Sequence, residues 1–169
     1  MNSERDAASS SWDTLLLATD GSPASDAATN AAIALGKPLG ARIVALSVAE
    51  PYPDCLQPLS EGYEHAAVRA AEGHAMRAAA AIRAAGLECE MLVLKSFAPH
   101  REIVRIADER HCGAIFMGVH GASPVGRFFF GSQTQKVLAE TTVPVMLARG
   151  GMQRTKPAMA SPMPMDEQV

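Results

Sequence analysis

The sequence Gly-Val-His-Gly at residues 118–121, followed nine residues later by Gly-Ser-Gln-Thr at residues 131–134, decides the fold of this chain. The apolar run Ala-Ile-Phe-Met at residues 114–117 precedes this stretch, and a helical pattern over residues 134–141 follows it. This order predicts a strand from the apolar run, a loop from the segment with glycines, and the start of a helix from the helical pattern.

The start of that helix is suited to an anion, because its first N–H groups have no partner within the helix and carry a partial positive charge. Gly131 allows a phosphate to approach the backbone closely. Ser132 either caps the helix or donates its hydroxyl to a phosphate oxygen. We expect Gly118 and Gly121 in turns that a Cβ atom would resist. The alternative is that these glycines only build turns, but their combination with a strand and a helix favours a nucleotide site.

The same order of strand and helix recurs along the whole chain. Apolar runs without alternation are typical of strands that are buried on both faces of a parallel sheet. The third run alternates Glu88 and Glu90 with apolar residues, and the fifth contains Pro144, so we expect these two strands at edges. The pattern predicts an α/β fold with right-handed crossovers and helices on both faces of a parallel sheet. The strands are expected over residues 14–19, 42–49, 88–94, 114–117 and 143–148, and the helices over 23–37, 64–85, 99–111 and 134–141.

Turn and cap residues delimit the first two of these helices. Ser22 and Pro23 are typical of an N-cap and a first helical residue. Pro38 and Gly40 are expected to stop the first helix at about Lys37. Gly86 stands where a glycine commonly follows the last turn of a helix.

Composition and charge exclude several classes of protein. The net charge of -3, the absence of a basic run and an aromatic content of 5% argue against nucleic-acid binding. The three cysteines are scattered without a CxxC motif, which indicates a reducing compartment, and no His/Cys cluster has metal-ligand spacing. His65 and His74 are assigned to the solvated face of their helix. The sequence has neither an apolar run of membrane-spanning length nor a recognisable signal peptide, so we expect no membrane association and a cytoplasmic location.

The chain of 169 residues is long enough for one domain. Residues 1–12 are rich in serine, alanine and charge, and residues 150–169 are rich in proline and methionine. Both segments are predicted to be disordered tails. The domain is therefore expected to cover residues 13–149.

Asp20 is the first carboxylate after the first strand. It is interpreted either as a turn residue or as a partner for the ribose or base of a nucleotide, because ligands of such folds bind beyond the carboxyl ends of the strands. If the first and fourth strands are neighbours, the loop that carries Asp20 faces the loop at residues 118–121 across a crevice, and one ligand can contact both.

These residues resemble the universal stress proteins, in their ATP-binding subgroup. The most specific part of the resemblance is the signature G-x2-G-x9-G-[ST], met by Gly118, Gly121, Gly131 and Ser132, and Asp20 also matches. The resemblance covers residues 13–149. Gln133 departs from the family, which usually has a small apolar or hydroxyl residue there.

The resemblance implies a three-layer α/β/α sandwich with a Rossmann-like five-stranded parallel sheet in the order 3-2-1-4-5. It also implies a homodimer, and we expect pairing through the apolar edge of the fifth strand. The implied cofactor is ATP, either alone or with Mg²⁺, in the crevice. The implied binding residues are Ala18, Thr19, Asp20, Val48, Met117, Gly118, His120, Gly121, Gly131, Ser132, Gln133 and Thr134.

The crevice lacks the sequence features of an efficient phosphoryl-transfer enzyme. The lysine that precedes the Ser/Thr of a P-loop is replaced by Gly131, and no carboxylate pair or nucleophile-base arrangement stands out near the loop. We therefore name no catalytic residue and expect a homodimeric ATP-binding stress-response protein whose nucleotide sets its conformation or its choice of an unknown protein partner. The alternatives are a slow ATPase that uses His120 or Arg127, and an interaction module that does not depend on nucleotide.

Overall fold

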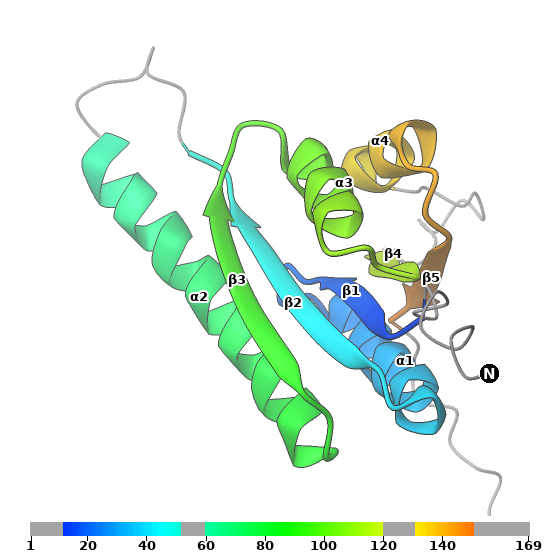
Figure 1. Cartoon of the computed structure of the whole chain (residues 1–169). Coiled ribbons are helices and arrows are strands. Elements are labelled where there is room, and N and C mark those ends of the chain that lie inside the picture. The colour runs from blue at the N-terminus through cyan, green and yellow to red at the C-terminus, as the bar shows by residue number, and fades with distance from the viewer. Residues whose placement is uncertain (1–11, 52–59, 120–130, 151–169) are drawn as a thin grey trace, which may run out of the picture.

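The computed structural model describes residues 12–51, 60–119 and 131–150, which alternate between strands and helices (Figure 1). Apart from Trp12 and Gly150, the predicted tails over residues 1–12 and 150–169 lie outside the described residues. The strands are β1 (Thr14–Ala18), β2 (Arg42–Ala49), β3 (Cys89–Lys95), β4 (Ala114–Val119) and β5 (Val145–Arg149). The helices are α1 (Pro23–Leu39), α2 (Ser60–Ala84), α3 (Pro99–Glu109) and α4 (Ser132–Glu140).

The five strands form one parallel sheet in the order β3-β2-β1-β4-β5. This confirms the predicted α/β class, the strand order and the edge positions of β3 and β5. β1 lies at the centre, where Leu16 pairs with Val44 of β2 and with Ile115 of β4. Its leucines are completely buried, as expected for a central strand that is covered on both faces.

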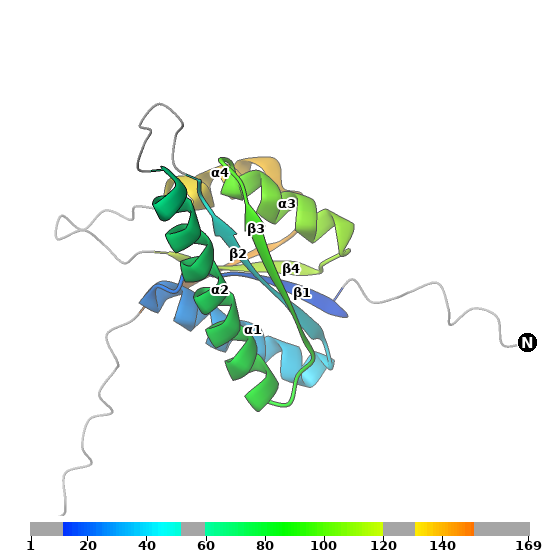
Figure 2. The same ribbon diagram turned by 90° about the vertical axis from the view of Figure 1, so that its left-hand side faces the viewer.

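Two helices cover each face of the sheet, so that the molecule has three layers (Figures 1 and 2). Successive side chains of β1 point to opposite faces. Leu15 and Leu17 therefore pack with alanines of α1 and α2, whereas Leu16 packs with Ile103 of α3 and Val137 of α4. The half-buried Trp12 packs against the first of these two clusters.

Helix α1 extends two residues beyond its predicted end, because Pro38 is accommodated in the last turn. In the last turn, the missing N–H and the ring of a proline disturb only the end of the helix, and the following residues close it instead. Gly40 is in the left-handed conformation with φ 64°, and its N–H donates to the carbonyl of Lys37 at 3.2 Å. The N–H of Ala41 donates to the carbonyl of Gly36 at 3.1 Å. Gly40, and not Pro38, therefore ends the helix.

Helix α2 brings His74 onto the loop between β1 and α1. A Cβ atom at Gly21 would lie 2.3 Å from Cδ2 of His74 and 2.6 Å from Nη2 of Arg77, so both side chains cover the backbone of Gly21. His74 is half-buried, and its assignment to a solvated face is wrong, whereas His65 is exposed as predicted. The reason is that α2 packs beside α1 and one side of it reaches this loop (Figure 2).

Candidate functional site

A cavity of about 300 Å³ lies at the carboxyl ends of β1, β2 and β4. The chain leaves β1 toward β2 on one side and reaches β4 on the other, so the cavity occupies the point at which the strand order reverses. Helix α3 and the first turn of α4 complete its wall. The lining residues are Ala18, Thr19, Asp20, Ser25, Leu46, Val48, Glu50, Pro99, Ile103, Met117, Gly118, Gly131, Ser132, Gln133 and Thr134.

Every residue of the predicted binding set that the structure describes lines this cavity. These residues come from the ends of three strands and from the start of α4, which only the folded sheet brings together. His120 and Gly121 of the predicted set, and Arg127 of the alternative ATPase, lie outside the described residues.

The loop after β1 is held by its own side chains. The carboxylate oxygen Oδ1 of Asp20 accepts a hydrogen bond from the N–H of Ser22 at 3.0 Å, so the turn interpretation of Asp20 is realised. Asp20 is also exposed and lines the cavity, so turn formation does not remove it from the site. Ser22 accepts from the N–H of Ser25 at 3.2 Å and caps α1 as predicted, with Pro23 in its first turn.

A buried hydroxyl pair connects the end of β1 to α1. The hydroxyl of Thr19 donates to Oγ of Ser25 at 3.2 Å, and the hydroxyl of Ser25 donates to the carbonyl of Ser22 at 2.8 Å. The N–H of Thr19 donates to the carbonyl of Leu46 on β2 at 2.9 Å. These bonds fix the backbone that presents Asp20 at the edge of the cavity.

The start of α4 forms the opposite wall. Gly131 is the N-cap residue, with φ -54° and ψ 152°, and no side chain caps the helix. The prediction that Ser132 could cap the helix is therefore wrong, because Ser132 is already the first helical residue and its hydroxyl remains available to a ligand. The first intrahelical bond is donated by the N–H of Gln135 to the carbonyl of Gly131 at 3.2 Å, so the amides before Gln135 have no partner within the helix.

One glycine of the signature, Gly118, has a different role from the one expected. Gly118 lies inside β4 and not in a turn. A Cβ atom there would lie 2.4 Å from the carbonyl carbon of Ala24 and 2.5 Å from the nitrogen of Ser25, so this glycine allows the first turn of α1 to pack on the strand. At Gly131 a Cβ atom would meet no described atom within 4 Å.

The model of the universal stress protein family matches residues 11–149 of the chain. The chain belongs to this family. A universal stress protein of Thermus aquaticus, from the QAH/OAS sulfhydrylase 3′ region, is 36% identical over 137 residues, which are 80% of this chain and 98% of that protein.

Solved universal stress proteins share the fold. A structure from Archaeoglobus fulgidus in complex with dAMP has a TM-score of 0.59 and 19% identity, over 81% of this chain and 97% of that chain. A universal stress protein structure in complex with cAMP has a TM-score of 0.58 and 22% identity, over 84% of this chain and 100% of that chain.

Five lining residues of this universal stress protein were missed by the motif, which marks only loop and helix-start positions. The signals that could have found some of them are periodic. Leu46 is two residues before Val48 on β2 and therefore faces the same side of the sheet. Ile103 lies three residues before Ile106 and four before Ala107, which is the spacing of an apolar helix face. Ser25, Glu50 and Pro99 carry no such signal and reach the cavity through the packing of their elements.

Two further properties concern the described part of this universal stress protein. Within residues 12–51, 60–119 and 131–150, no three His, Cys, Asp or Glu side chains gather closely enough to hold a metal ion. No helix in these ranges combines the length and the apolar character needed to cross a membrane.

Proposed function

We propose that this universal stress protein is a regulatory protein that binds ATP in the cavity at the end of β1 and β4. The proposal depends on one observation: Asp20 and the first amides of α4 line the same cavity. This cavity lies where the strand order reverses. This arrangement offers a carboxylate to a sugar hydroxyl on one side and, on the other, N–H groups that have no partner within their own helix to phosphates.

The parts of the nucleotide have matching surfaces in the cavity. The adenine would contact the backbone of Val48, with apolar walls from Leu46 and Ile103. The ribose would hydrogen-bond to Asp20, and the phosphates would lie at the start of α4. The complexes of two related structures with dAMP and cAMP support an adenine nucleotide of some kind. Gly131 lines the cavity, and no described atom lies within 4 Å of its Cβ position, which supports a nucleotide with a phosphate chain.

The described lining favours regulation over rapid hydrolysis. Among the residues that the structure describes, the cavity wall contains no lysine, arginine or histidine. Rapid phosphoryl transfer needs such charges around the transferred group. ATP turnover by wild type that equals that of an efficient ATPase would contradict this part of the proposal.

We also propose a homodimer through β5. This strand is an edge, with Met146 45% exposed, and Leu138 of the neighbouring α4 is 43% exposed. An apolar edge strand is a template for pairing with another chain, and a second copy presents the same strand. Light scattering should give twice the chain mass, and Met146→Lys should reduce it to the monomer mass. A monomer of wild type at high concentration would contradict the dimer.

The thiols of Cys89 and Cys112 are free, which fits the proposed cytoplasmic location, since thiols persist in reducing compartments.

The decisive experiment for the nucleotide is mass spectrometry of the small molecule released when freshly purified protein is denatured. Titration calorimetry with ATP, ADP, cAMP and GTP then ranks affinities. We expect adenine nucleotides to bind, ATP most tightly, and Gly131→Val to abolish binding because its side chain fills the space beside the helix start. Wild type that remains empty at millimolar ATP, with no change in melting temperature, would overturn the proposal.

A further inference from the structure

His100 occupies an unusual place beside the cavity. It is the second residue of α3 and is only 8% exposed, whereas the other histidines that the structure describes are half-buried or exposed. It lies where α3 packs against α4 on the same face of the sheet (Figure 1). A buried imidazole needs polar partners, because an unsatisfied buried donor or acceptor is costly.

Among the described residues, Gln133 and Glu140 of α4 contact His100. Oε1 of Gln133 lies 3.3 Å from the backbone nitrogen of His100 and 3.3 Å from its ring nitrogen Nδ1. Oε1 of Glu140 lies 3.4 Å from the other ring nitrogen, Nε2. Gln133 and Glu140 are seven residues apart, which is about two turns, so they share one face of α4. The imidazole ring of His100 thus contacts side chains from both ends of this face of α4.

The backbone contact determines which way the amide of Gln133 is turned. A backbone N–H can only donate, so the atom of Gln133 that faces it must be the carbonyl oxygen. This bond also supplies an acceptor at the start of α3, where the N-cap residue Ala98 provides no side-chain cap. With the oxygen held by His100, the amide group that Gln133 retains for other partners is its NH₂, which donates two hydrogen bonds.

The ring contacts determine which protonation state fits. Nδ1 must carry a proton to donate to Gln133, and Nε2 must carry one to donate to Glu140. A neutral imidazole has one N–H and can satisfy one of the two oxygens, whereas an imidazolium satisfies both. The arrangement around His100 is therefore complete only when the ring is charged.

Gln133 also lines the cavity in the first turn of α4. Its side chain adds an amide to the wall. An NH₂ donor suits phosphate oxygens, which only accept hydrogen bonds. A contact that holds the side chain of Gln133 in place therefore preorganises the start of α4 for binding a phosphate chain.

We propose that His100 is a positioning residue for the phosphate end of the cavity, because it holds the carbonyl oxygen of Gln133 and so presents the amide NH₂ of Gln133 to the ligand. The hold is strongest when the ring carries both protons. Affinity for a nucleotide with a phosphate chain is therefore higher when the ring is charged than when it is neutral. This proposal rests on the proposed nucleotide site.

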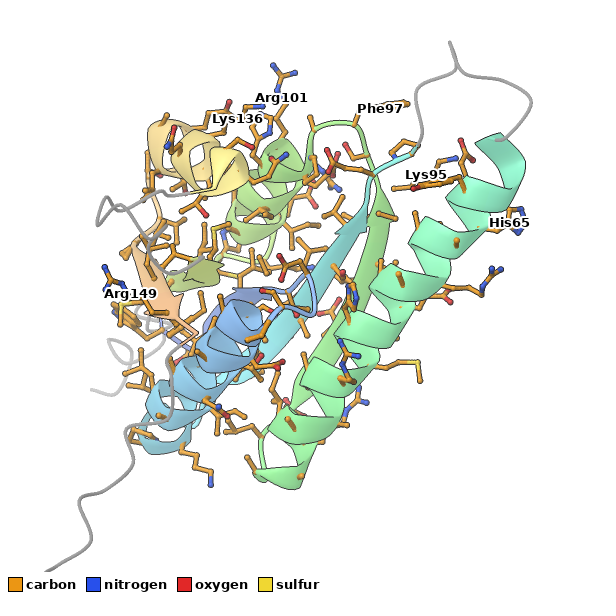
Figure 3. The ribbon with its side chains drawn as sticks, turned by 180° about the vertical axis from the view of Figure 1, so that it is seen from behind. His65, Lys95, Phe97, Arg101, Lys136 and Arg149 are labelled. Atoms are coloured by element: carbon orange, nitrogen blue, oxygen red, sulfur yellow. The ribbon has the colours of Figure 1, made fainter. Side chains whose placement is uncertain are left out.

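The charges around the ring are few and of both signs. Glu140 of α4 faces Nε2 directly and favours the charged ring. Arg101, the next residue on α3, and Lys136, between Gln133 and Glu140 on α4, are exposed on the outer side of the two helices (Figure 3). Glu50 contributes a carboxylate to the cavity wall from the end of β2.

The test compares wild type with His100→Asn, whose side-chain NH₂ replaces the donor at Nδ1 but cannot change charge. The matched control is His111→Asn, an exposed histidine just beyond the end of the same helix. Dissociation constants for ATP and adenosine are measured by calorimetry at pH 6 and pH 8. Changes in the ionisation of ATP itself are common to all the proteins and cancel in the comparison.

For ATP, we expect the ratio of the dissociation constant at pH 8 to that at pH 6 to be about threefold larger in wild type than in His100→Asn. His111→Asn should keep the wild-type ratio, and adenosine should show no difference, because it has no phosphate for Gln133 to contact. Gln133→Leu, which has similar size but no amide, should lose the excess pH dependence as well. Equal ratios in wild type and His100→Asn would overturn the proposal.

Hydrogen exchange of the free protein separates this proposal from the nucleotide assignment. The amides of α4 should be better protected in wild type than in His100→Asn at pH 6, and the difference should shrink at pH 8. If no adenine nucleotide binds, the proposed function fails. Hydrogen exchange of α4 then still tests the contact between His100 and Gln133. Equal protection of α4 in the two proteins at pH 6 would overturn the role of His100.

Discussion

The two faces of the sheet are covered in different ways. On one face α1 has 17 residues and α2 has 25, and buried alanines such as Ala28 and Ala32 let these helices approach the strands closely. On the other face α3 has 11 residues and α4 has 9, and the cavity opens beside them. The face covered by α1 and α2 is closely packed, whereas the face covered by α3 and α4 leaves room for a ligand at the carboxyl ends of the strands.

The glycine signature serves both faces. Gly118 removes a side chain where α1 packs on β4, and Gly131 leaves space where α4 faces the cavity. Substitutions at these two positions therefore test most directly whether the two faces differ in this way.

Gly118→Ala should have the largest effect. Its Cβ atom would meet the backbone of Ala24 and Ser25, which cannot move aside as a flexible side chain would. We expect a loss of about 3 kcal/mol in the free energy of unfolding. Urea denaturation measures this loss. A loss below about 1 kcal/mol would show that α1 can shift at little cost, which would contradict the close-packing role of this face.

Ala32→Leu tests the same face at a second place. Ala32 is completely buried between α1 and the sheet, so three extra carbon atoms must displace helix or strand. We expect the free energy of unfolding to fall by about 2 kcal/mol. The exposed position Ser132 on the other face provides the control, since Ser132→Ala should change it by less than about 0.5 kcal/mol. Equal effects at the two positions would remove the distinction between the faces.

Gly131→Ala tests the ligand face. Its backbone angles suit alanine, and the added Cβ atom meets no described atom, so the free energy of unfolding should fall by less than about 1 kcal/mol. The same Cβ atom occupies space assigned to the phosphates, and the dissociation constant for ATP should rise about tenfold, which corresponds to 1.4 kcal/mol. Denaturation and calorimetry on one preparation measure both quantities. A strongly destabilised variant would mean that this glycine, like Gly118, serves packing.

The smallest effect concerns Cys112, which is buried in the cluster beneath α3. Burial raises the pKa of its thiol to about 11, although Arg42 and Arg110 oppose the shift. A raised pKa in the folded state means that the neutral thiol stabilises the fold fully below the pKa of the unfolded chain, near 9. Stability should therefore fall as the pH rises from about 9 to 11.

Urea denaturation at pH 7, 9 and 10.5 of wild type and Cys112→Ala measures this contribution, because the variant lacks the thiol and should lose less stability over the same range. Parallel curves for the two proteins would show that the buried thiol adds nothing to the alkaline loss.

Most of the architecture could be predicted from local patterns. The unbroken apolar runs identified a parallel sheet, because strands covered on both faces show no alternation, and Ser22, Gly40 and Gly86 marked helix ends through conformations that depend on a few neighbouring residues. The motif and the family resemblance identified the loops of the site. Gly40 ends α1 as predicted, but the helix continues two residues beyond Lys37, because Pro38 is accommodated in its last turn.

What the linear pattern could not indicate depends on contacts between distant residues. Gly118 was assigned to a turn, but its importance comes from α1, which lies on it only in the folded sheet. His74 looked solvated until α2 was placed over Gly21. The contact between His100 and Gln133 joins residues 33 positions apart and turns the carbonyl oxygen of Gln133 toward α3. Backbone propensity and burial can be predicted from local sequence patterns. The roles of these residues arise from contacts between separate elements, and a local pattern does not indicate such contacts.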